Sequence, residues 1–244
     1  MPAILEVEGL AKRFGPFWAV REVDFVLGPG EILGFLGPNG AGKSTTMKMI
    51  TGYLPPSHGR AAICGADVEA EPMAARRALG YLPEGAPLYG DMTPAGLIDF
   101  VASVRRLRGR DRRRRRDWVV ERLGLGPVWH RPIDTLSKGF KRRVGLAQAV
   151  LHDPAVLILD EPTDGLDPNQ KHEVRLLLQE MAAEKAIVVS THLLEEVAAV
   201  CTRAMVIAEG RVVADQRPEV LFASASPEAV FRRLTLGREG DRAP

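Results

Sequence analysis

Short, nearly continuous apolar runs alternate along this chain with stretches in which apolar residues recur at helical spacing. The runs Ile32–Leu36, Ala155–Leu159 and Ala186–Ser190 are typical of strands that are covered on both faces. Thr93 and Asp167 are each followed by proline, and a capping side chain before a proline at the first helical position marks a helix start. The alternation predicts an α/β fold whose core sheet is mostly parallel and flanked by helices.

The N-terminal third follows a different pattern, in which strands are joined by turns. It predicts an antiparallel β edge subdomain with strands at Ile4–Leu10, Val20–Leu27 and Arg60–Cys64. Residues from about 92 to 130 predict two helices with no strand between them, which we expect to form an inserted helical subdomain. The sequence thus predicts one domain over residues 1–236 and a frayed tail at residues 237–244.

A glycine-rich segment directly follows the first buried strand and reads Gly37-Pro38-Asn39-Gly40-Ala41-Gly42-Lys43-Ser44-Thr45. Glycines let backbone N–H groups surround phosphate oxygens, and the following helix turns its positive end toward them. Lys43 is placed to reach the terminal phosphates, and the Ser44 hydroxyl is a ligand for Mg²⁺. The segment predicts binding of a nucleoside triphosphate. It does not separate kinases, GTPases and ATPases, and a glycine-rich turn with a chance lysine is the simplest alternative.

Two adjacent acids end the second apolar run. Asp160 and Glu161 follow Leu157–Leu159, and ligands of open α/β sheets collect at the carboxyl ends of strands. Asp160 is expected to hold Mg²⁺, directly or through water. Glu161 faces the other way in an extended chain and is expected to polarise an attacking water. A solvated strand end is the alternative for such a pair taken alone.

Composition narrows the class of protein. The 244 residues include 33 Lys and Arg against 31 Asp and Glu, a net charge of +2 that argues against a general nucleic-acid binder. The longest uncharged stretches are far shorter than the roughly 20 apolar residues of a membrane span, and Glu6 and Glu8 interrupt the first apolar run, so neither a span nor a secretory signal is expected. Cys64 and Cys201 match no metal-binding spacing, and we expect buried free thiols rather than a disulfide.

Further motifs occur in a fixed order after the phosphate loop. Leu136-Ser137-Lys138-Gly139 precedes the acidic strand, and Asp164-Gly165-Leu166-Asp167 and Ser190-Thr191-His192 follow it. This order resembles the nucleotide-binding subunit of ATP-binding cassette (ABC) transporters, from about residue 4 to the low 220s. The resemblance implies a P-loop ABC cassette fold that binds ATP and Mg²⁺.

The resemblance also implies roles for single residues. Phe14 matches the aromatic residue, usually tyrosine, that stacks on adenine. His192 matches the histidine that contacts the γ-phosphate, and Asp167 matches the acid that links the two nucleotide sites of a dimer. Ser137 and Gly139, at the start of a predicted helix, match the positions that meet the phosphate bound by the other protomer. A head-to-tail dimer with two ATP molecules at its interface is therefore implied.

Two motifs depart from the commonest family pattern. Lys138 and Phe140 replace a glycine and a glutamine, and Glu84 stands in place of a glutamine that lies near the metal. A carboxylate at that position can still bind Mg²⁺. Both departures, and the segment Pro227–Leu234, are similar to the bacterial export branch with gliding-motility, drug-export and sodium-export cassettes. The resemblance implies an ATPase on the cytoplasmic face of the inner membrane that powers a separate permease of an exporter.

Two other classes of protein remain as alternatives. The first is a soluble ABC ATPase that acts on ribosomes or DNA. Such relatives carry two cassettes in one chain, or a long coiled coil inserted between the phosphate loop and the Ser137 motif. This chain has one cassette, and its segment between Lys43 and Ser137 is too short for such an insertion. The second is a metabolic P-loop kinase, which has no use for the segment around Ser137. No specific nucleic-acid partner is expected.

One segment is strongly basic although the chain as a whole is nearly neutral. Nine of the twelve residues in Arg105–Arg116 are arginine. Three interpretations stay open: a solvated helix–loop–helix surface, attraction to anionic lipid headgroups, and a phosphate-binding patch for nucleic acid. No aromatic residues that would stack on bases are interleaved with the arginines, which weakens the last interpretation.

Overall fold

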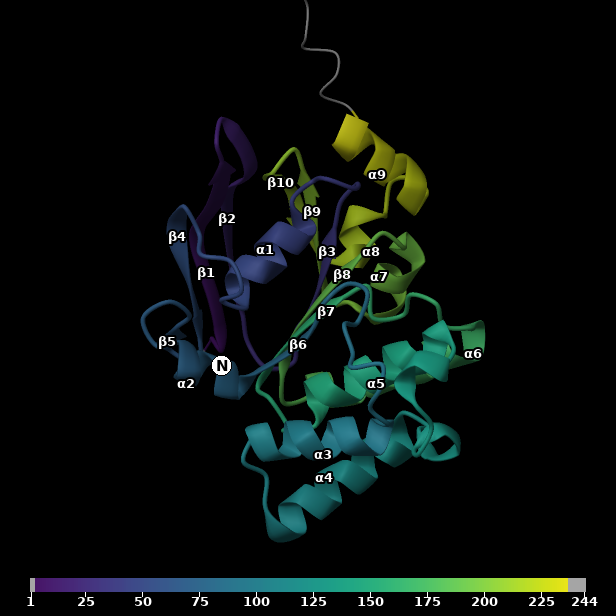
Figure 1. The fold of residues 1–244 in the computed structure, drawn as a ribbon. Helices are drawn as coiled ribbons and strands as arrows, with labels where there is room; N and C mark the ends of the chain where they lie inside the picture. Colours follow the sequence, from purple (N-terminus) through teal and green to yellow (C-terminus); the bar gives the residue numbers. More distant parts are fainter. Residues whose placement is uncertain (1–2, 237–244) are drawn as a thin grey trace, which may run out of the picture.

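The structure is a computed structural model that describes residues 3–236 (Figure 1). Its ten strands form one sheet in the order β5-β4-β1-β2-β10-β9-β3-β8-β7-β6. The strands are β1 (Leu5–Phe14), β2 (Phe17–Leu27), β3 (Ile32–Leu36), β4 (His58–Ile63), β5 (Ala66–Asp67), β6 (Leu79–Leu82), β7 (Val156–Asp160), β8 (Ala186–Thr191), β9 (Arg203–Ala208) and β10 (Arg211–Gln216). The helices are α1 (Lys43–Ile50), α2 (Pro72–Ala78), α3 (Pro94–Val104), α4 (Gly109–Arg122), α5 (Lys138–Val150), α6 (Pro168–Ala182), α7 (Leu194–Val200), α8 (Pro218–Leu221) and α9 (Pro227–Leu236), with short 3₁₀ turns at Gly126–Val128 and Ile133–Thr135.

The centre of the sheet is parallel, as predicted. β3 pairs with β8, β8 with β7 and β7 with β6, all in parallel register. Side chains of successive strand residues point to opposite faces, so each central strand contributes to two hydrophobic clusters. In β7, Val156 and Ile158 pack in the cluster around α1, whereas Leu157 and Leu159 pack in the cluster around α5, α6 and α7. Burial on both faces explains the continuous apolar runs of the sequence.

The N-terminal strands are antiparallel, also as predicted. β1 pairs with β2 on one side and with β4 on the other. β1 extends to Phe14 and β2 begins at Phe17, so the hairpin is longer than the sequence pattern indicated. Four strands, β5, β6, β9 and β10, were not predicted as strands at all.

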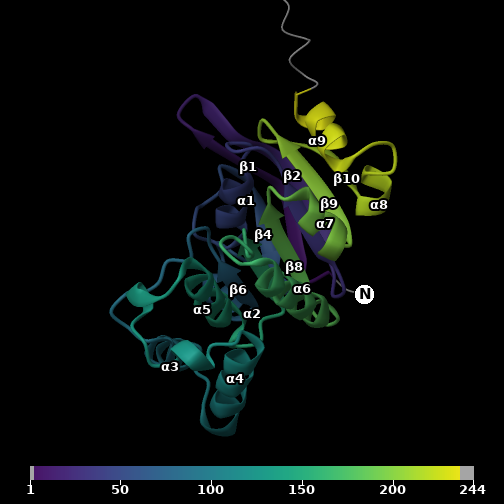
Figure 2. The ribbon, with the colours of Figure 1, turned by 90° about the vertical axis from the view of Figure 1, so that its right-hand side faces the viewer.

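The segment between β6 and β7 is helical. The Thr93 side chain accepts a hydrogen bond from Gly96 N at 3.1 Å and so caps α3, which confirms the predicted helix start. Leu97, Ile98 and Ala102 turn one face of α3 into the cluster that also contains α5. Figures 1 and 2 show α3 and α4 at the end of the molecule opposite α9. Treating residues 92–130 as a subdomain stays a prediction.

Three further expectations concern the cysteines, the tail and the membrane. Cys201 is buried as expected, but Cys64 is exposed, because it lies in the turn after β4 with a φ of 51°. Both cysteines are free thiols. The predicted frayed tail, 237–244, lies outside the described residues. None of the helices between residues 3 and 236 combines the length and apolar character that crossing a bilayer requires.

Candidate functional site

The phosphate loop connects β3 to α1, and close packing requires glycine at two of its positions, Gly37 and Gly42. A Cβ on Gly37 would lie 2.5 Å from the carbonyl oxygen of Ile207. A Cβ on Gly42, which has a φ of 108°, would lie 2.5 Å from the carbonyl oxygen of Ala19. Only glycine fits at these two positions. The loop is thereby held against β2 and β9, with Asn39 and Gly40 exposed at its tip.

Lys43 begins α1 and is buried within the loop. Its Nζ donates hydrogen bonds to Gly37 O at 2.6 Å and to Pro38 O at 3.1 Å. Burial lowers the pKa of Lys43, and nearby carboxylates act in the opposite direction, in the order Glu161, Asp160 and Glu84. The structure thus brings one ammonium group and three predicted carboxylates into a single electrostatic site. Ser44 and Thr45, in the first turn of α1, are half-buried beside it.

Asp160 ends β7 and is 2% exposed. Its Oδ1 accepts a hydrogen bond from Ser190 Oγ. Its Oδ2 is buried and has no hydrogen-bond partner among the described residues. A buried carboxylate oxygen is costly to leave without a partner, and a divalent cation supplies one. The donor chemistry of Asp160 therefore fits Mg²⁺.

Glu161 lies just beyond the strand, where the chain is not extended as the sequence analysis assumed. Its φ of 51° is in the left-handed region, so alternation along an extended chain does not set where its side chain points. The backbone N–H of Glu161 donates to Ser190 O at 2.9 Å, and its Oε1 lies 2.8 Å from His192 Nδ1. Glu161 and His192 are therefore adjacent, as a joint role in catalysis requires. His192 is exposed, so the pair is open to a bound ligand.

Arg142 is a buried residue of this site that the sequence analysis missed. Its guanidinium donates hydrogen bonds to the carbonyl oxygens of Asp160 and Glu161 and, at 3.2 Å, to that of Pro83. It is 4% exposed, and burial lowers its pKa while the surrounding carboxylates raise it. The sequence signal that could have identified Arg142 was its helical spacing from Gly139 and Leu146, which places it on the inward face of α5.

Glu196 is a second buried residue that was missed. It is 6% exposed and accepts hydrogen bonds from Thr163 Oγ1 and, at 3.2 Å, from Thr191 Oγ1. Thr163 follows Glu161 by two residues, and Thr191 precedes His192. Glu196 therefore joins the two segments that carry Glu161 and His192.

The start of α5 lies against the segment after Glu161. Ser137 caps the helix, since its Oγ accepts from Phe140 N at 3.4 Å. The Lys138 ammonium lies 2.9 Å from Asp164, and this hydrogen bond is the main reason that the pKa of Asp164 is lowered. A Cβ on Gly139 would lie 3.2 Å from Gly165 O. Within residues 3–236, no hydrogen bond or ion pair joins residues 137–139 to the phosphate loop.

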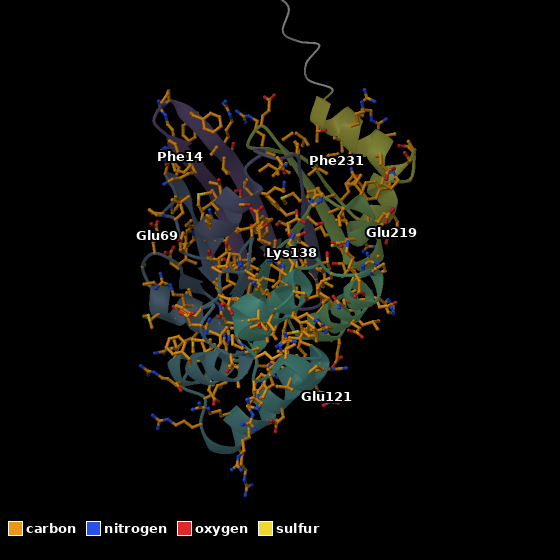
Figure 3. All side chains as sticks on the ribbon, turned by 45° about the vertical axis from the view of Figure 1, so that its right-hand side comes forward. Phe14, Glu69, Glu121, Lys138, Glu219 and Phe231 are labelled. Carbon is orange, nitrogen blue, oxygen red and sulfur yellow. The ribbon has the colours of Figure 1, made fainter. Side chains whose placement is uncertain are left out.

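Phe14, Asp167 and Glu84 come from three different parts of the chain. Phe14 is on the β1–β2 hairpin opposite Phe17, with its ring 49% exposed (Figure 3). Lys12 Nζ lies 5.4 Å from the centre of that ring. Asp167 caps α6, because it accepts from Gln170 N at 2.9 Å. Glu84 is exposed in the loop after β6.

Comparison with known proteins gives a consistent result. A family model described as "ABC transporter" matches residues 20–164. YbhF of Escherichia coli, named "Probable multidrug ABC transporter ATP-binding protein", is 38% identical over 224 residues, which are 91% of this chain and only 39% of YbhF. "Nod factor export ATP-binding protein I" of Ralstonia nicotianae is 35% identical over 90% of this chain and 68% of its own length. A solved structure, "Structure of ATP binding subunit of ABC transporter", is 30% identical with a TM-score of 0.88 and covers 95% of this chain and 99% of the other.

These matches agree with the order of motifs in the sequence and with the fold of the structure. The predicted P-loop ABC cassette fold is confirmed by the solved structure. The predicted resemblance is confirmed by the family model and by relatives that include multidrug and Nod factor export proteins. The chain belongs to the ABC transporter family and is one of its ATP-binding subunits, an ABC ATPase.

Proposed function

We propose that this chain binds and hydrolyses Mg-ATP as a dimer and powers a separately encoded membrane permease of an exporter. The observation that carries the proposal is that Asp160 and Glu161 are near enough to the buried Lys43 ammonium for their charges to raise its pKa. The export direction rests on the names of the relatives, which include a multidrug and a Nod factor export protein. The chain would act on the cytoplasmic side of the inner membrane, bound there through its permease.

The phosphate loop is proposed to hold the triphosphate. Backbone N–H groups from Gly40 to Thr45 surround the phosphates, together with the N-terminus of α1 and the Lys43 ammonium. Lys43 Nζ exchanges its bonds to the loop carbonyls for bonds to phosphate oxygens. The exposed ring of Phe14 stacks on the adenine.

Ser44, Asp160 and Glu84 are the proposed ligands of Mg²⁺. Within residues 3–236, no three His, Cys, Asp or Glu side chains form a cluster able to hold a metal ion by themselves. This suits Mg²⁺, which proteins commonly bind through one or two carboxylates and the phosphates of the substrate. When bound, Mg²⁺ neutralises negative charge on the β- and γ-phosphates.

Glu161 and His192 are proposed to carry the hydrolysis step. Glu161 takes a proton from the water whose oxygen forms a bond to the γ-phosphorus. The bond from that phosphorus to the β–γ bridging oxygen breaks, and ADP leaves with the electron pair. His192, held 2.8 Å from Glu161, contacts the γ-phosphate and orients the water.

A second copy is proposed to complete each nucleotide site. Ser137 and Gly139 lie at the N-terminus of α5, where backbone N–H groups favour an anion. They make no bond to the phosphate loop of their own chain within the described residues, so we assign them to the phosphates bound by the partner copy. Asp167, which begins α6, is proposed to link the two sites.

The permease is proposed to dock in a cleft of about 1020 Å³ that is lined by residues of α2, β6 and α3. Large apolar side chains that are 49% to 77% exposed gather in this cleft and in the groove beside it. They are Tyr53, Met73, Tyr89, Phe100 and Val104. Contiguous exposed apolar surface of this kind marks an interaction site.

The catalytic part of the proposal is tested with Glu161→Gln. This change removes the base and keeps the size of the side chain. We expect kcat to fall by a factor on the order of a hundred or more while ATP binding persists. Hydrolysis is measured with Mg²⁺ and without any acceptor, a condition under which a kinase would be silent. Normal turnover by the variant would refute the assignment of Glu161.

The transport part is tested by purifying the tagged chain from native membranes. A polytopic membrane protein is expected to accompany it, and rRNA or DNA in its place would favour the soluble alternative. Tyr53→Asp is expected to lose this partner. Leu176→Asp, at a 52% exposed position on α6, is the matched control and is expected to keep it.

A further inference from the structure

The arginine-rich segment concentrates positive charge in one part of a nearly neutral chain. Residues 105–122 contain ten arginines and three acidic residues, a net charge of +7. The whole chain carries +2, so the other residues together carry −5. Such an asymmetry orients a molecule toward an oppositely charged partner. The segment begins directly after α3 and comprises the connection to α4 and α4 itself.

Six of these ten arginines make contacts within the fold, among them Arg122, which pairs with Glu180. Arg115 donates to Val150 O and Leu151 O at the end of α5, and its guanidinium lies over the ring of Trp118. Arg105 donates to two backbone carbonyls, Arg112 pairs with Asp99, Arg114 with Asp111 and Arg116 with Asp117. The structure thus gives a structural reason for part of the run, including its most buried members.

Four arginines of the segment have no such use. Arg106, Arg108, Arg110 and Arg113 are exposed, and none of them takes part in a side-chain hydrogen bond or ion pair with residues 3–236. We call these four residues the basic edge. Figure 3 shows nitrogen-tipped side chains extending outward from this end of the molecule, where Glu121 is labelled. Their charge is therefore available to a partner.

The basic edge borders the cleft proposed to receive the permease. Arg106 lines that cleft together with Val104, and Arg76 and Arg77 of α2 line it too. If the permease docks there, the basic edge faces the membrane beside it. This step rests on the proposed function. The negative surface potential of a cytoplasmic leaflet acts within about a Debye length, which long arginine side chains at the edge of a docked subunit can enter.

We propose that the basic edge binds anionic lipid headgroups next to the docked permease. Headgroup attraction needs only exposed positive charge, which these residues supply. Single-stranded nucleic acid is bound with aromatic side chains that stack on bases. The one aromatic residue of α4, Trp118, is half-buried with Arg115 over its ring, which leaves no such platform.

The test compares two triple variants that change the net charge equally. The first is Arg108→Gln, Arg110→Gln and Arg113→Gln, which leaves the cleft residue Arg106 in place. The matched control is Arg211→Gln, Arg232→Gln and Arg233→Gln. These three arginines are exposed near the opposite end of the molecule, and their side chains make no hydrogen bonds or ion pairs in the described part of the chain. Thermal unfolding checks that both variants fold. The purified full chain is sedimented with vesicles of phosphatidylcholine alone and with vesicles of phosphatidylcholine mixed with phosphatidylglycerol. Each measurement is made at low and at high salt.

We expect the unaltered chain to bind only the anionic vesicles, and to do so more weakly at high salt. Each arginine at a membrane surface contributes about 1 kcal/mol, so loss of three should lower the partition coefficient on the order of a hundredfold. The control should keep most of the binding. Arg108→Lys, Arg110→Lys and Arg113→Lys should also keep it, because the charge is retained.

Equal loss of binding in the control would overturn the proposal, as would failure of the unaltered chain to bind anionic vesicles. Tighter binding to an oligonucleotide than to vesicles at equal phosphate concentration would also overturn it in favour of nucleic acid. The vesicles contain no permease and the assay needs no ATP. Failure here is therefore distinguishable from failure of the proposed ATPase and transport function, which hydrolysis and copurification measure separately.

Discussion

Replacing Arg142 by methionine tests whether this buried residue positions the acidic end of β7. The change keeps a long apolar stem and removes the guanidinium that donates to the carbonyl oxygens of Pro83, Asp160 and Glu161. A buried acceptor left without a donor costs about 1–3 kcal/mol. Part of that loss is offset, because a buried charge no longer has to be desolvated. We therefore expect the free energy of unfolding to fall by about 2–4 kcal/mol.

The same substitution should also lower kcat. The left-handed conformation of Glu161, with a φ of 51°, is one that a non-glycine residue keeps only when its surroundings hold it. Without Arg142 the Glu161 backbone loses one of its anchors, and we expect kcat to fall roughly tenfold or more. KM for ATP should change little, because the phosphate loop is untouched. Arg142→Lys keeps a charged donor and should restore part of kcat.

Arg143→Met is the matched control on the same helix. Arg143 is also buried, but it donates to Leu123 O at the end of α4 and lies over the Phe140 ring, away from the acidic strand end. It should lower stability without lowering kcat. Thermal unfolding and steady-state hydrolysis over a range of ATP concentrations measure both effects. At about 2–4 °C per kcal/mol for a protein of this size, Arg142→Met should lower Tm by roughly 5–15 °C. Equal kcat values for the two variants would refute the positioning role.

Three further predictions concern the dimer, the pH dependence of stability and the thiols. Ser137→Arg, added to the hydrolysis-deficient variant described above, should abolish the ATP-dependent dimer in light scattering while each monomer still binds ATP; a persistent dimer would contradict the two-copy site. Burial, with Arg105 nearby, lowers the pKa of His152 to about 4, so the unfolded state binds more protons between the ordinary histidine pKa and that value. The contribution of neutral His152 to the free energy of unfolding is fully present above about pH 6.5 and is lost as the pH drops toward 4, by ~3 kcal/mol in total. In urea titrations across the pH range, His152→Asn should remove this pH-dependent contribution. A thiol reagent should modify Cys64 in the folded protein and Cys201 only on unfolding, because Cys201 is buried and its pKa is raised to about 12; equal rates would show that the segment around Cys201 opens readily.

Local physical chemistry accounts for what could be predicted from the sequence. The phosphate loop, the buried strands and the capped helix starts at Thr93, Ser137 and Asp167 each depend on interactions within a few residues. Such patterns can be recognised without a structure, because each turn, cap or apolar run carries its cause within its own segment. The order of the motifs then led to the family, whose model and relatives confirm it.

Tertiary structure alone decided which distant residues support the site. Arg142 and Asp160 meet because α5 packs beside β6 and β7, and Glu196 joins Thr163 to Thr191 across the ends of β7 and β8. The sequence could not separate the arginines that bind backbone carbonyls from those that face solvent, nor place Cys64 at the surface. Charge and size are local properties of a residue, whereas its burial and partners depend on packing between segments far apart in the chain.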